Sequence, residues 1–219
     1  MRKIIVATFV SLDGVMQAPG GPQEDPTGGF TLGGWTAPYF DAAVGASIGE
    51  IFGRPFDLLL GRKTYEIFAA HWPHVTDPNE PLAGALNQAK KYVASRSNPK
   101  LTWQNSKLLG ADVVAVLTKL KGEDGPDLLV QGSSELLQTL WKNRLVDELT
   151  MLIFPLVLGR GKRLFGNGAV PAELKLVKSK PCPSGVFVVS YEPSGAVKTG
   201  DFQLAEPTDA ELERRRQLI

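Results

Sequence analysis

Short apolar runs and helical repeats alternate along most of this chain. Apolar runs predict buried strands at residues 3–10, 56–60, 91–95 and 127–131, and from 151 onward. Apolar positions three and four apart predict helices at about 38–52, 63–70, 82–89, 113–121 and 135–143. A further strand is expected at residues 101–105. Strict alternation predicts a terminal antiparallel hairpin formed by residues 174–179 and 186–192.

This order of elements predicts one α/β domain. A strand, a helix and a second strand in succession normally give parallel strands, so we expect a mixed, mostly parallel sheet with helices on both faces. The 219 residues, 43% of them hydrophobic, are enough for one well-buried domain. We place it at residues 1–193, followed by a polar tail at 194–219. Thr208 and Glu211 form a capping-box pattern for a short last helix in that tail.

Residues 17–36 interrupt the pattern with a long segment rich in glycine and proline. A loop of this length inside a compact domain is usually functional or mobile. It ends close to two aromatic residues, Trp35 and Phe40. We expect this loop, with both aromatic side chains, to form a flexible wall or lid over a bound substrate.

Composition excludes several classes of protein. The net charge of +1 gives no support for binding to nucleic acid. The single cysteine, Cys182, rules out an internal disulfide and a multi-cysteine metal site, and it fits a reducing compartment. The first apolar run is too short to span a membrane. These features predict a cytoplasmic protein that binds neither membranes nor nucleic acid.

The turn after the strand at 56–60 has the features of an anion site. Gly61 permits a tight turn, Arg62 and Lys63 carry positive charge, and Thr64 lies at the start of the predicted helix. The first amides of a helix and its dipole attract an anion, most simply a phosphate. The alternative is an exposed helix start that carries two surface cations.

A second turn repeats this arrangement after the strand at 127–131. Gly132 allows close approach of the backbone, and Ser133 or Ser134 can cap the next helix or bind a phosphate oxygen. Ordinary turn chemistry is the alternative, because glycine and serine are common in turns. Two phosphate sites fit a ligand with more than one phosphate group, such as a dinucleotide.

Six segments in chain order carry a resemblance to a known family. They are VSLDG at 10–14, GRKTYE at 61–66, YVASR at 92–96, VQGS at 130–133, LVDEL at 145–149 and PLVLGRGKRLF at 155–165. The chain resembles the dihydrofolate-reductase-like superfamily across residues 3 to about 192. It looks most like a stand-alone relative of the reductase domain of the bacterial riboflavin-biosynthesis deaminase-reductase. The resemblance implies the three-layer dihydrofolate-reductase-like fold, the cofactor NADPH and a homodimer, with residues 151–158 as a contact edge.

The resemblance also assigns roles to individual residues. It implies that the turn at Gly61 to Thr64 holds the adenosine-side phosphates, with its cations favouring the 2′-phosphate of NADPH. Ser95 and Arg96 would lie beside that 2′-phosphate, and Gly132, Ser133 and Ser134 beside the pyrophosphate. A plain surface position remains the alternative for Arg96.

The segment after the first strand is implied to lie beside the nicotinamide and the substrate. Ser11 and Gly14 would contact substrate, and the Asp13 carboxylate would bind it or help to route a proton. A simple Asp-Gly turn is the alternative. Asp41 matches no pterin-binding motif of the dihydrofolate reductases and is interpreted as a helix-start charge.

Other patterns predict no further chemistry. His71 and His74 flank Trp72-Pro73, but no acidic or cysteine cluster completes a metal site, so we expect a loop that caps the core. Gly159 to Lys162 fails the spacing of both the P-loop and the dinucleotide fingerprint. No paired-cysteine motif of a zinc deaminase is present, so we expect the deaminase half to be lacking.

The sequence therefore predicts an NADPH-dependent reductase of a small heterocyclic or carbonyl-bearing substrate, riboflavin-pathway-like or pterin-like. The alternative from another class is an inactive nucleotide-binding or ligand-sensing module, because fold does not fix function. A purely structural oligomerisation domain is a third, weaker interpretation. No metal is expected.

Overall fold

The computed structural model describes residues 1–77, 80–166, 169–202 and 206–218. Its strands are β1 (Ile4–Ser11), β2 (Phe56–Gly61), β3 (Lys91–Ala94), β4 (Ser106–Leu108), β5 (Asp127–Gln131), β6 (Glu148–Phe154), β7 (Glu173–Pro181) and β8 (Phe187–Gly195). Its α-helices are α1 (Ala42–Phe52), α2 (Arg62–His71), α3 (Pro81–Gln88), α4 (Val113–Gly122), α5 (Ser134–Lys142) and α6 (Asp209–Arg216). Short 3₁₀ turns lie at Thr27–Gly29, Ala37–Tyr39 and Trp72–His74.

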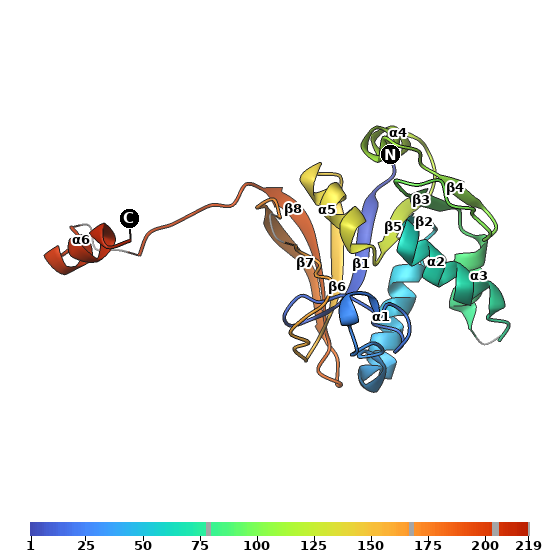
Figure 1. Ribbon diagram of the computed structural model, residues 1–219, viewed down its shortest axis with the longest axis horizontal. Coiled ribbons are helices and arrows are strands. Elements are labelled where there is room, and N and C mark those ends of the chain that lie inside the picture. The colour runs from blue at the N-terminus through green and yellow to red at the C-terminus, as the bar shows by residue number, and fades with distance from the viewer. Residues whose placement is uncertain (78–79, 167–168, 203–205, 219) are drawn as a thin grey trace.

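The strands form one sheet in the order β4-β3-β2-β5-β1-β6-β8-β7 (Figure 1). The six strands from β4 to β6 run parallel to their neighbours, whereas β8 pairs antiparallel with both β6 and β7. The predicted mostly parallel sheet and the terminal hairpin are therefore confirmed. Because β8 pairs with β6, Met151 to Phe154 do not form a free edge of the sheet. The expected contact of residues 151–158 with a second chain stays a prediction.

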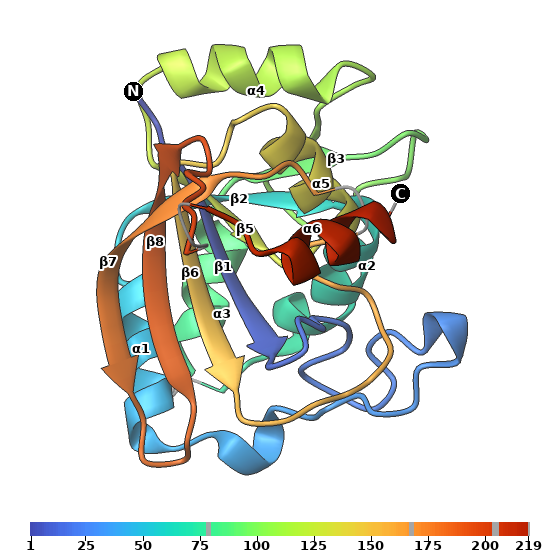
Figure 2. The ribbon, with the colours of Figure 1, turned by 90° about the vertical axis from the view of Figure 1, so that its left-hand side faces the viewer.

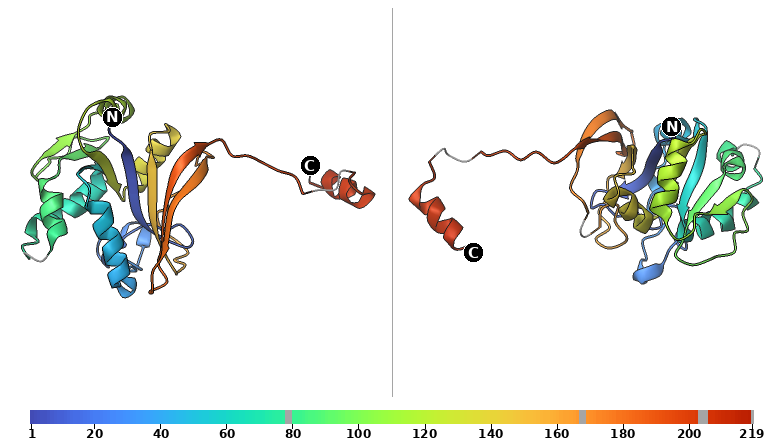
Figure 3. Two further views of the ribbon diagram at one scale, coloured as in Figure 1. Left: turned by 180° about the vertical axis from the view of Figure 1, so that it is seen from behind. Right: turned by 90° about the horizontal axis from the view of Figure 1, so that it is seen from above.

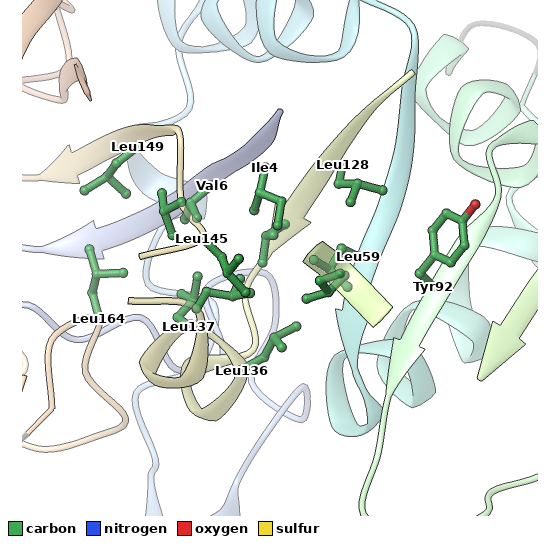
Figure 4. Close-up of a cluster of buried hydrophobic side chains, with 14 of the residues drawn as sticks. Ile4, Val6, Leu59, Tyr92, Leu128, Leu136, Leu137, Leu145, Leu149 and Leu164 are labelled. Atoms are coloured by element: carbon green, nitrogen blue, oxygen red, sulfur yellow. The ribbon is translucent and has the colours of Figure 1, made fainter. Parts of the chain in front are cut away.

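One face of the sheet is covered by α4 and α5. Alternate side chains of β1, β5 and β6, including Ile4, Val6 and Leu149, pack against the apolar face of α5, as Figure 4 shows. Leu137 and Leu140 of α5 are fully buried in this cluster. Charged and polar positions of α5 face outward, which is the amphipathic pattern of a helix that covers one side of a sheet.

The other face carries α1, α2 and α3. Val44 of α1 packs with Phe154, and Tyr65 of α2 packs with Leu58, Leu60 and Leu86. In Figure 2, α1 and α3 pass behind the strands. The predicted helices on both faces are thus confirmed, and the structure has the three layers of the dihydrofolate-reductase-like fold.

Two predicted elements differ in detail. The predicted strand at 101–105 is irregular, because the buried Trp103 turns inward and its backbone amide donates to the Tyr65 hydroxyl at 2.9 Å. Asn105, with a φ of 58°, then turns the chain into β4. The helix expected from residue 38 begins at Ala42, because the Asp41 side chain caps it by accepting from the Val44 amide at 2.8 Å.

The C-terminal part stands clear of the sheet. β8 runs to Gly195, past the boundary expected at residue 193, and residues 196–202 lead away from the body (Figure 3). The expected last helix is present as α6, and Thr208 caps it by accepting from the Glu211 amide. In the part of the chain that the structure describes, no helix has the length and apolar character needed to cross a bilayer.

Candidate functional site

The turn from β2 into α2 presents free backbone amides at a helix start. Gly61 is the residue before α2 and provides no side-chain cap, so the first amides of α2 have no side-chain acceptor. Arg62 follows and forms an ion pair with Glu66 at 2.8 Å on the exposed side of the helix. By contrast, α1, α4 and α6 are each capped by their own Asp or Thr side chain. The α2 start is therefore available to an external anion.

The turn from β5 into α5 has an unusual backbone. Gly132 and Ser133 have φ values of 66° and 65°, both in the left-handed region. Glycine adopts this conformation freely, but serine does so at a cost of roughly 1–2 kcal/mol. Ser133 precedes α5 without capping it, so the amides that begin at Ser134 are also available. Successive amides in such a turn form a concave anion-binding surface.

One hydroxyl joins the two turns. Ser133 Oγ accepts from the Gly61 amide at 2.8 Å and donates to Thr64 Oγ1 at 2.7 Å. A Cβ on Gly61 would lie 3.1 Å from both Cβ and Oγ of Ser133, so glycine is what allows this approach. The two predicted phosphate turns are therefore adjacent, and together they form one continuous wall, which we call the phosphate wall after that prediction.

The end of β3 adds a third part to this wall. Ser95 Oγ lies 3.1 Å from Ser97 Oγ, and Arg96 forms an exposed ion pair with Glu135 at 3.3 Å. All the residues predicted to bind the cofactor line a single cleft of about 1610 Å³, namely Gly61, Arg62, Lys63, Thr64, Ser95, Arg96, Gly132, Ser133 and Ser134. Because β2, β3 and β5 are parallel neighbours, their carboxyl ends meet at one edge of the sheet, as sites in such folds do.

The cleft continues past β1 and along α1. Thr8 and Phe9 of β1 line it, and Phe9 makes an edge-to-face contact with Phe40, with ring centroids 6.0 Å apart. Phe40 lines the cleft as expected. Trp35 does not: its indole is 7% exposed in the core, and its ring nitrogen donates to the Gln17 carbonyl at 2.8 Å. Because the Trp35 side chain is large and mostly apolar, it packs in the core and does not line the cleft.

The first part of the glycine-rich loop forms another wall. Residues 16–25 line the cleft, held in place by Gln17, whose side-chain amide donates to the carbonyls of Asp25 and Thr27 at 2.9 Å. Burial would raise the pKa of Asp25, but hydrogen bonds from Lys162 and Thr27 outweigh it and leave this pKa below its usual value. These contacts fix residues 16–25 as one wall of the cleft, whereas residues 26–36 do not line it. The role of the loop as a wall or lid over a substrate stays a prediction.

Glu24 is the carboxyl group of this loop that the sequence did not indicate. Its Oε2 accepts from the amides of Gly20 and Gly21 at 2.5 and 3.2 Å. Burial raises the pKa of the Glu24 carboxyl, and the two amide hydrogen bonds offset that rise only in part. Glu24 therefore lines the cleft in surroundings that disfavour the charged form of its carboxyl group.

Asp13, the predicted catalytic carboxylate, organises a loop outside the cleft lining. It accepts from the amides of Leu158 and Gly159 at 3.0 and 2.9 Å and from the Ser11 hydroxyl at 2.6 Å. Burial would raise the pKa of Asp13, but these hydrogen bonds lower it to about 2. Ser11 is 1% exposed, and Gly14 makes a turn with a φ of 82°. Neither is part of the cleft lining, so this segment has the geometry of a structural turn.

The three remaining candidate residues, Asp41, His71 and His74, have different places in the structure. Asp41 caps α1 and also accepts from the Ser184 amide at 2.8 Å, in agreement with a helix-start role. His71 lines the cleft at the end of α2, whereas His74 lies outside its lining. Across the described ranges, no three His, Cys, Asp or Glu side chains gather closely enough to hold a metal ion.

The sequence analysis also did not identify two glycines of α1 as part of the cleft. Gly45 and Gly49 line the cleft together with Ile48 and Phe52. Their spacing of four residues places them on one helical face, and glycine in a helix interior is costly without a reason. That spacing was the available signal.

The family follows from a comparison of the whole chain. Residues 2–188 match the family model described as the RibD C-terminal domain. The chain belongs to this family. The protein YyaP of Bacillus subtilis (strain 168), described as uncharacterized, is 28% identical over 200 residues, which cover 89% of this chain and 96% of that one.

Solved structures agree on the fold. A dihydrofolate reductase from Enterococcus faecalis, complexed with NADP(H) and RAB-propyl, matches with a TM-score of 0.54 and 14% identity over 87% of this chain and 96% of its own. A diaminohydroxyphosphoribosylaminopyrimidine deaminase/5-amino-6-(5-phosphoribosylamino)uracil reductase from Thermotoga maritima matches with a TM-score of 0.56 and 16% identity, covering 88% of this chain and 57% of its own. The RibD family thus shares its fold with dihydrofolate reductase.

Proposed function

We propose that this protein is an NADPH-dependent reductase that transfers a hydride to a small heterocyclic or carbonyl-bearing substrate. The observation that carries the proposal is the wall formed by the turns at Gly61 and Gly132 and joined through Ser133. It offers two helix starts without side-chain caps to a ligand with two phosphate groups. The family match and the NADP(H) complex of the Enterococcus reductase support the same cofactor.

The chain's own residues would bind and orient this cofactor. The amides that begin α5 would face the pyrophosphate, and the cations Arg62, Lys63 and Arg96 would favour a 2′-phosphate. NADPH, when bound, supplies the hydride from C4 of its nicotinamide. Phe9, Phe40 and the loop at 16–25 would exclude water beside the substrate. Glu24 is a carboxyl group in the lining of that part of the cleft.

A nucleotide-binding or ligand-sensing module without turnover is the second candidate. One observation favours it: Asp13, the carboxylate expected to act in catalysis, is fully engaged with the loop at 158–159. The two candidates share the nucleotide site and differ only in whether a substrate is reduced.

Two measurements on the full chain test this proposal. Titration with NADPH and NADH, followed by nucleotide fluorescence, tests the binding site. Oxidation of NADPH in the presence of pterins, aminopyrimidines and quinones then tests turnover. Binding with turnover supports the reductase, and binding without turnover across the panel favours the sensor. Absence of dinucleotide binding would contradict both.

A further inference from the structure

The part of the cleft beyond the phosphate wall has a composition of its own. From Thr64 to His71, α2 carries the cleft roughly 10 Å away from the phosphate turns at 1.5 Å per residue. We call this part the far half. It is lined by one face each of α1, α2 and α3, together with β1 and the loop at 16–25.

Apolar groups dominate the far half. Its apolar side chains are Phe9, Met16, Phe40, Ile48, Phe52, Ile67, Phe68, Trp72, Leu82, Ala85 and Leu86. Several are aromatic, and such walls favour flat, apolar rings through edge-to-face or stacked contacts. Burial of apolar surface is therefore the main source of affinity that this half offers.

Two glycines of α1 keep the far half open. A Cβ built on Gly45 or on Gly49 would meet no atom within 4 Å, so both positions border free space. Gly45 and Gly49 are one helical turn apart, so they lie on the same face of α1. On that face, beside the side chains of Ile48 and Phe52, the cleft borders the helix backbone directly. The surface accepts a flat ring that a longer side chain at residue 49 would exclude.

The charges of the far half oppose an anion. Its described acidic side chains are Glu24, Asp25 and Glu80, and its described basic ones are Lys162 and His71. Lys162 is already paired with Asp25. Lys162 therefore offers no free positive charge, and the described lining of the far half holds no arginine and no other lysine. The cations Arg62, Lys63 and Arg96 lie at the other end, on the phosphate wall.

We propose that the substrate of this protein is an uncharged, largely apolar, planar ring compound that carries no phosphate. This inference rests on the proposed function, because it assumes that the dinucleotide occupies the phosphate wall. A phosphate or other anion on the substrate would face the carboxyl groups of Glu24 and Glu80 in a part of the cleft whose walls are mostly apolar and whose lysine is already paired. Desolvation of that anion without a matching cation disfavours its binding.

A matched pair of probes tests the inference. The full chain is saturated with NADP⁺ and titrated with 1,4-naphthoquinone and with 1,4-naphthoquinone-2-sulfonate, and binding is followed by quenching of tryptophan fluorescence. The two probes share a ring and differ in one negative charge. We expect the neutral quinone to bind at least about tenfold more tightly than the sulfonate, which corresponds to about 1.4 kcal/mol. Equal or tighter binding of the sulfonate would overturn the inference.

A variant of α1 tests the location. Gly49→Leu fills the free space beside α1 and should weaken binding of the neutral quinone at least about tenfold, with NADP⁺ affinity held within about twofold. The matched control is Gly84→Leu: Gly84 is also an exposed helical glycine with no atom within 4 Å of its Cβ position, but it lies outside the cleft lining. Its quinone affinity should match that of the unchanged protein.

The outcomes separate this inference from the function on which it rests. Failure to bind NADP⁺ contradicts the proposed reductase. Normal NADP⁺ affinity, combined with no quinone binding or with unchanged quinone binding in the Gly49→Leu variant, overturns the substrate class alone. Loss of quinone binding in both leucine variants would show a general effect of the substitution and would also count against the location.

Discussion

Ser133 donates its hydroxyl hydrogen to Thr64 Oγ1 at 2.7 Å, although the two residues are 69 positions apart in the chain. The same oxygen accepts from the Gly61 amide. This bridge fixes the start of α2 against the start of α5, so both helix ends can face one ligand.

Removal of the bridge should weaken both stability and cofactor binding. Ser133→Ala loses two hydrogen bonds while its backbone stays left-handed, so we expect a loss of about 1–2 kcal/mol in the free energy of unfolding. Ser133→Gly loses the same hydroxyl but relieves the backbone cost, and it should be the more stable of the two by about 1 kcal/mol. Urea unfolding measures the stability of both variants. Equal stability of the two variants would contradict the argument.

Arg62 should distinguish the two dinucleotides. Arg62→Ala should weaken NADPH binding by about 10-fold or more, because a charged hydrogen bond to the 2′-phosphate contributes about 1.5–3 kcal/mol. Binding of NADH, which lacks that phosphate, should change by less than about twofold. Glu66→Gln is the matched control: it frees Arg62 from its ion pair and should tighten NADPH binding. An equal loss for both dinucleotides would show that Arg62 does not contact the 2′-phosphate.

Asp13 should affect acid stability. Its pKa is lowered to about 2 from an ordinary 3.8, so its carboxylate stabilises the fold above pH 3.8. This contribution is lost as the pH falls from 3.8 towards 2, where the carboxyl becomes protonated. Asp13→Asn should therefore be less stable than the unchanged chain at pH 7, and the gap should narrow below pH 4. Urea unfolding from pH 7 to pH 3 measures it. A variant with full stability but no turnover would restore the catalytic interpretation.

Lys91 should affect stability at alkaline pH. It is fully buried, with its ammonium 4.1 Å from the centroid of the Trp103 ring and 2.7 Å from the Asn87 carbonyl oxygen. Burial lowers its pKa from 10.5 to about 8, so between these values the unfolded chain binds more protons than the folded one. Its contribution to stability should therefore rise as the pH increases from 8 to 10.

Two variants isolate that rise. Lys91→Met should remove the part of the pH dependence between 8 and 10 that Lys91 contributes, whereas Lys90→Met, at the exposed neighbouring position, should keep it. Chemical unfolding at closely spaced pH values compares the three proteins. Parallel curves for all three would show that Lys91 titrates normally.

The expected homodimer remains a prediction, with a different surface. β7 is an edge strand of the sheet, and it exposes Leu176 and Val177 to 51% and 55%. Unpaired edge strands with apolar side chains favour pairing between chains. Light scattering at micromolar concentration should show a dimer, and Val177→Lys should convert it to a monomer near 23.7 kDa. A monomer before substitution would exclude this interface.

The sheet and the strand-to-helix turns at Gly61 and Gly132 were predictable because their signals are local. An apolar run that ends in glycine, followed by cations and a helical repeat, describes the turn at Gly61 without reference to the rest of the chain. The same holds for Gly132. Each strand end could therefore be assigned from a few neighbouring residues.

The far half of the cleft and the roles of Asp13 and Trp35 could not be predicted from the sequence, because they depend on contacts between distant parts of the chain. Asp13 looks like a catalytic carboxylate until the amides at 158–159, 145 positions and more away in sequence, are placed against it. Trp35 is buried through a hydrogen bond to Gln17 across a loop that has no periodic pattern. The position of the Glu24 carboxyl group in the cleft depends on the fold of the same loop. Local patterns contain no information on such contacts.

The origin of the cleft walls has a consequence for how the family can diversify. The residues of the phosphate wall all fall between positions 61 and 135, whereas the β1, loop and α1 walls of the far half come from residues before 54. A chimaera that exchanges only residues 1–53 with a relative should keep its choice of nucleotide and acquire a new substrate preference. The substrate preference can thus diverge through residues 1–53 without a change in the stretch that forms the phosphate wall, although α2 and α3, which lie in that stretch, also line the far half.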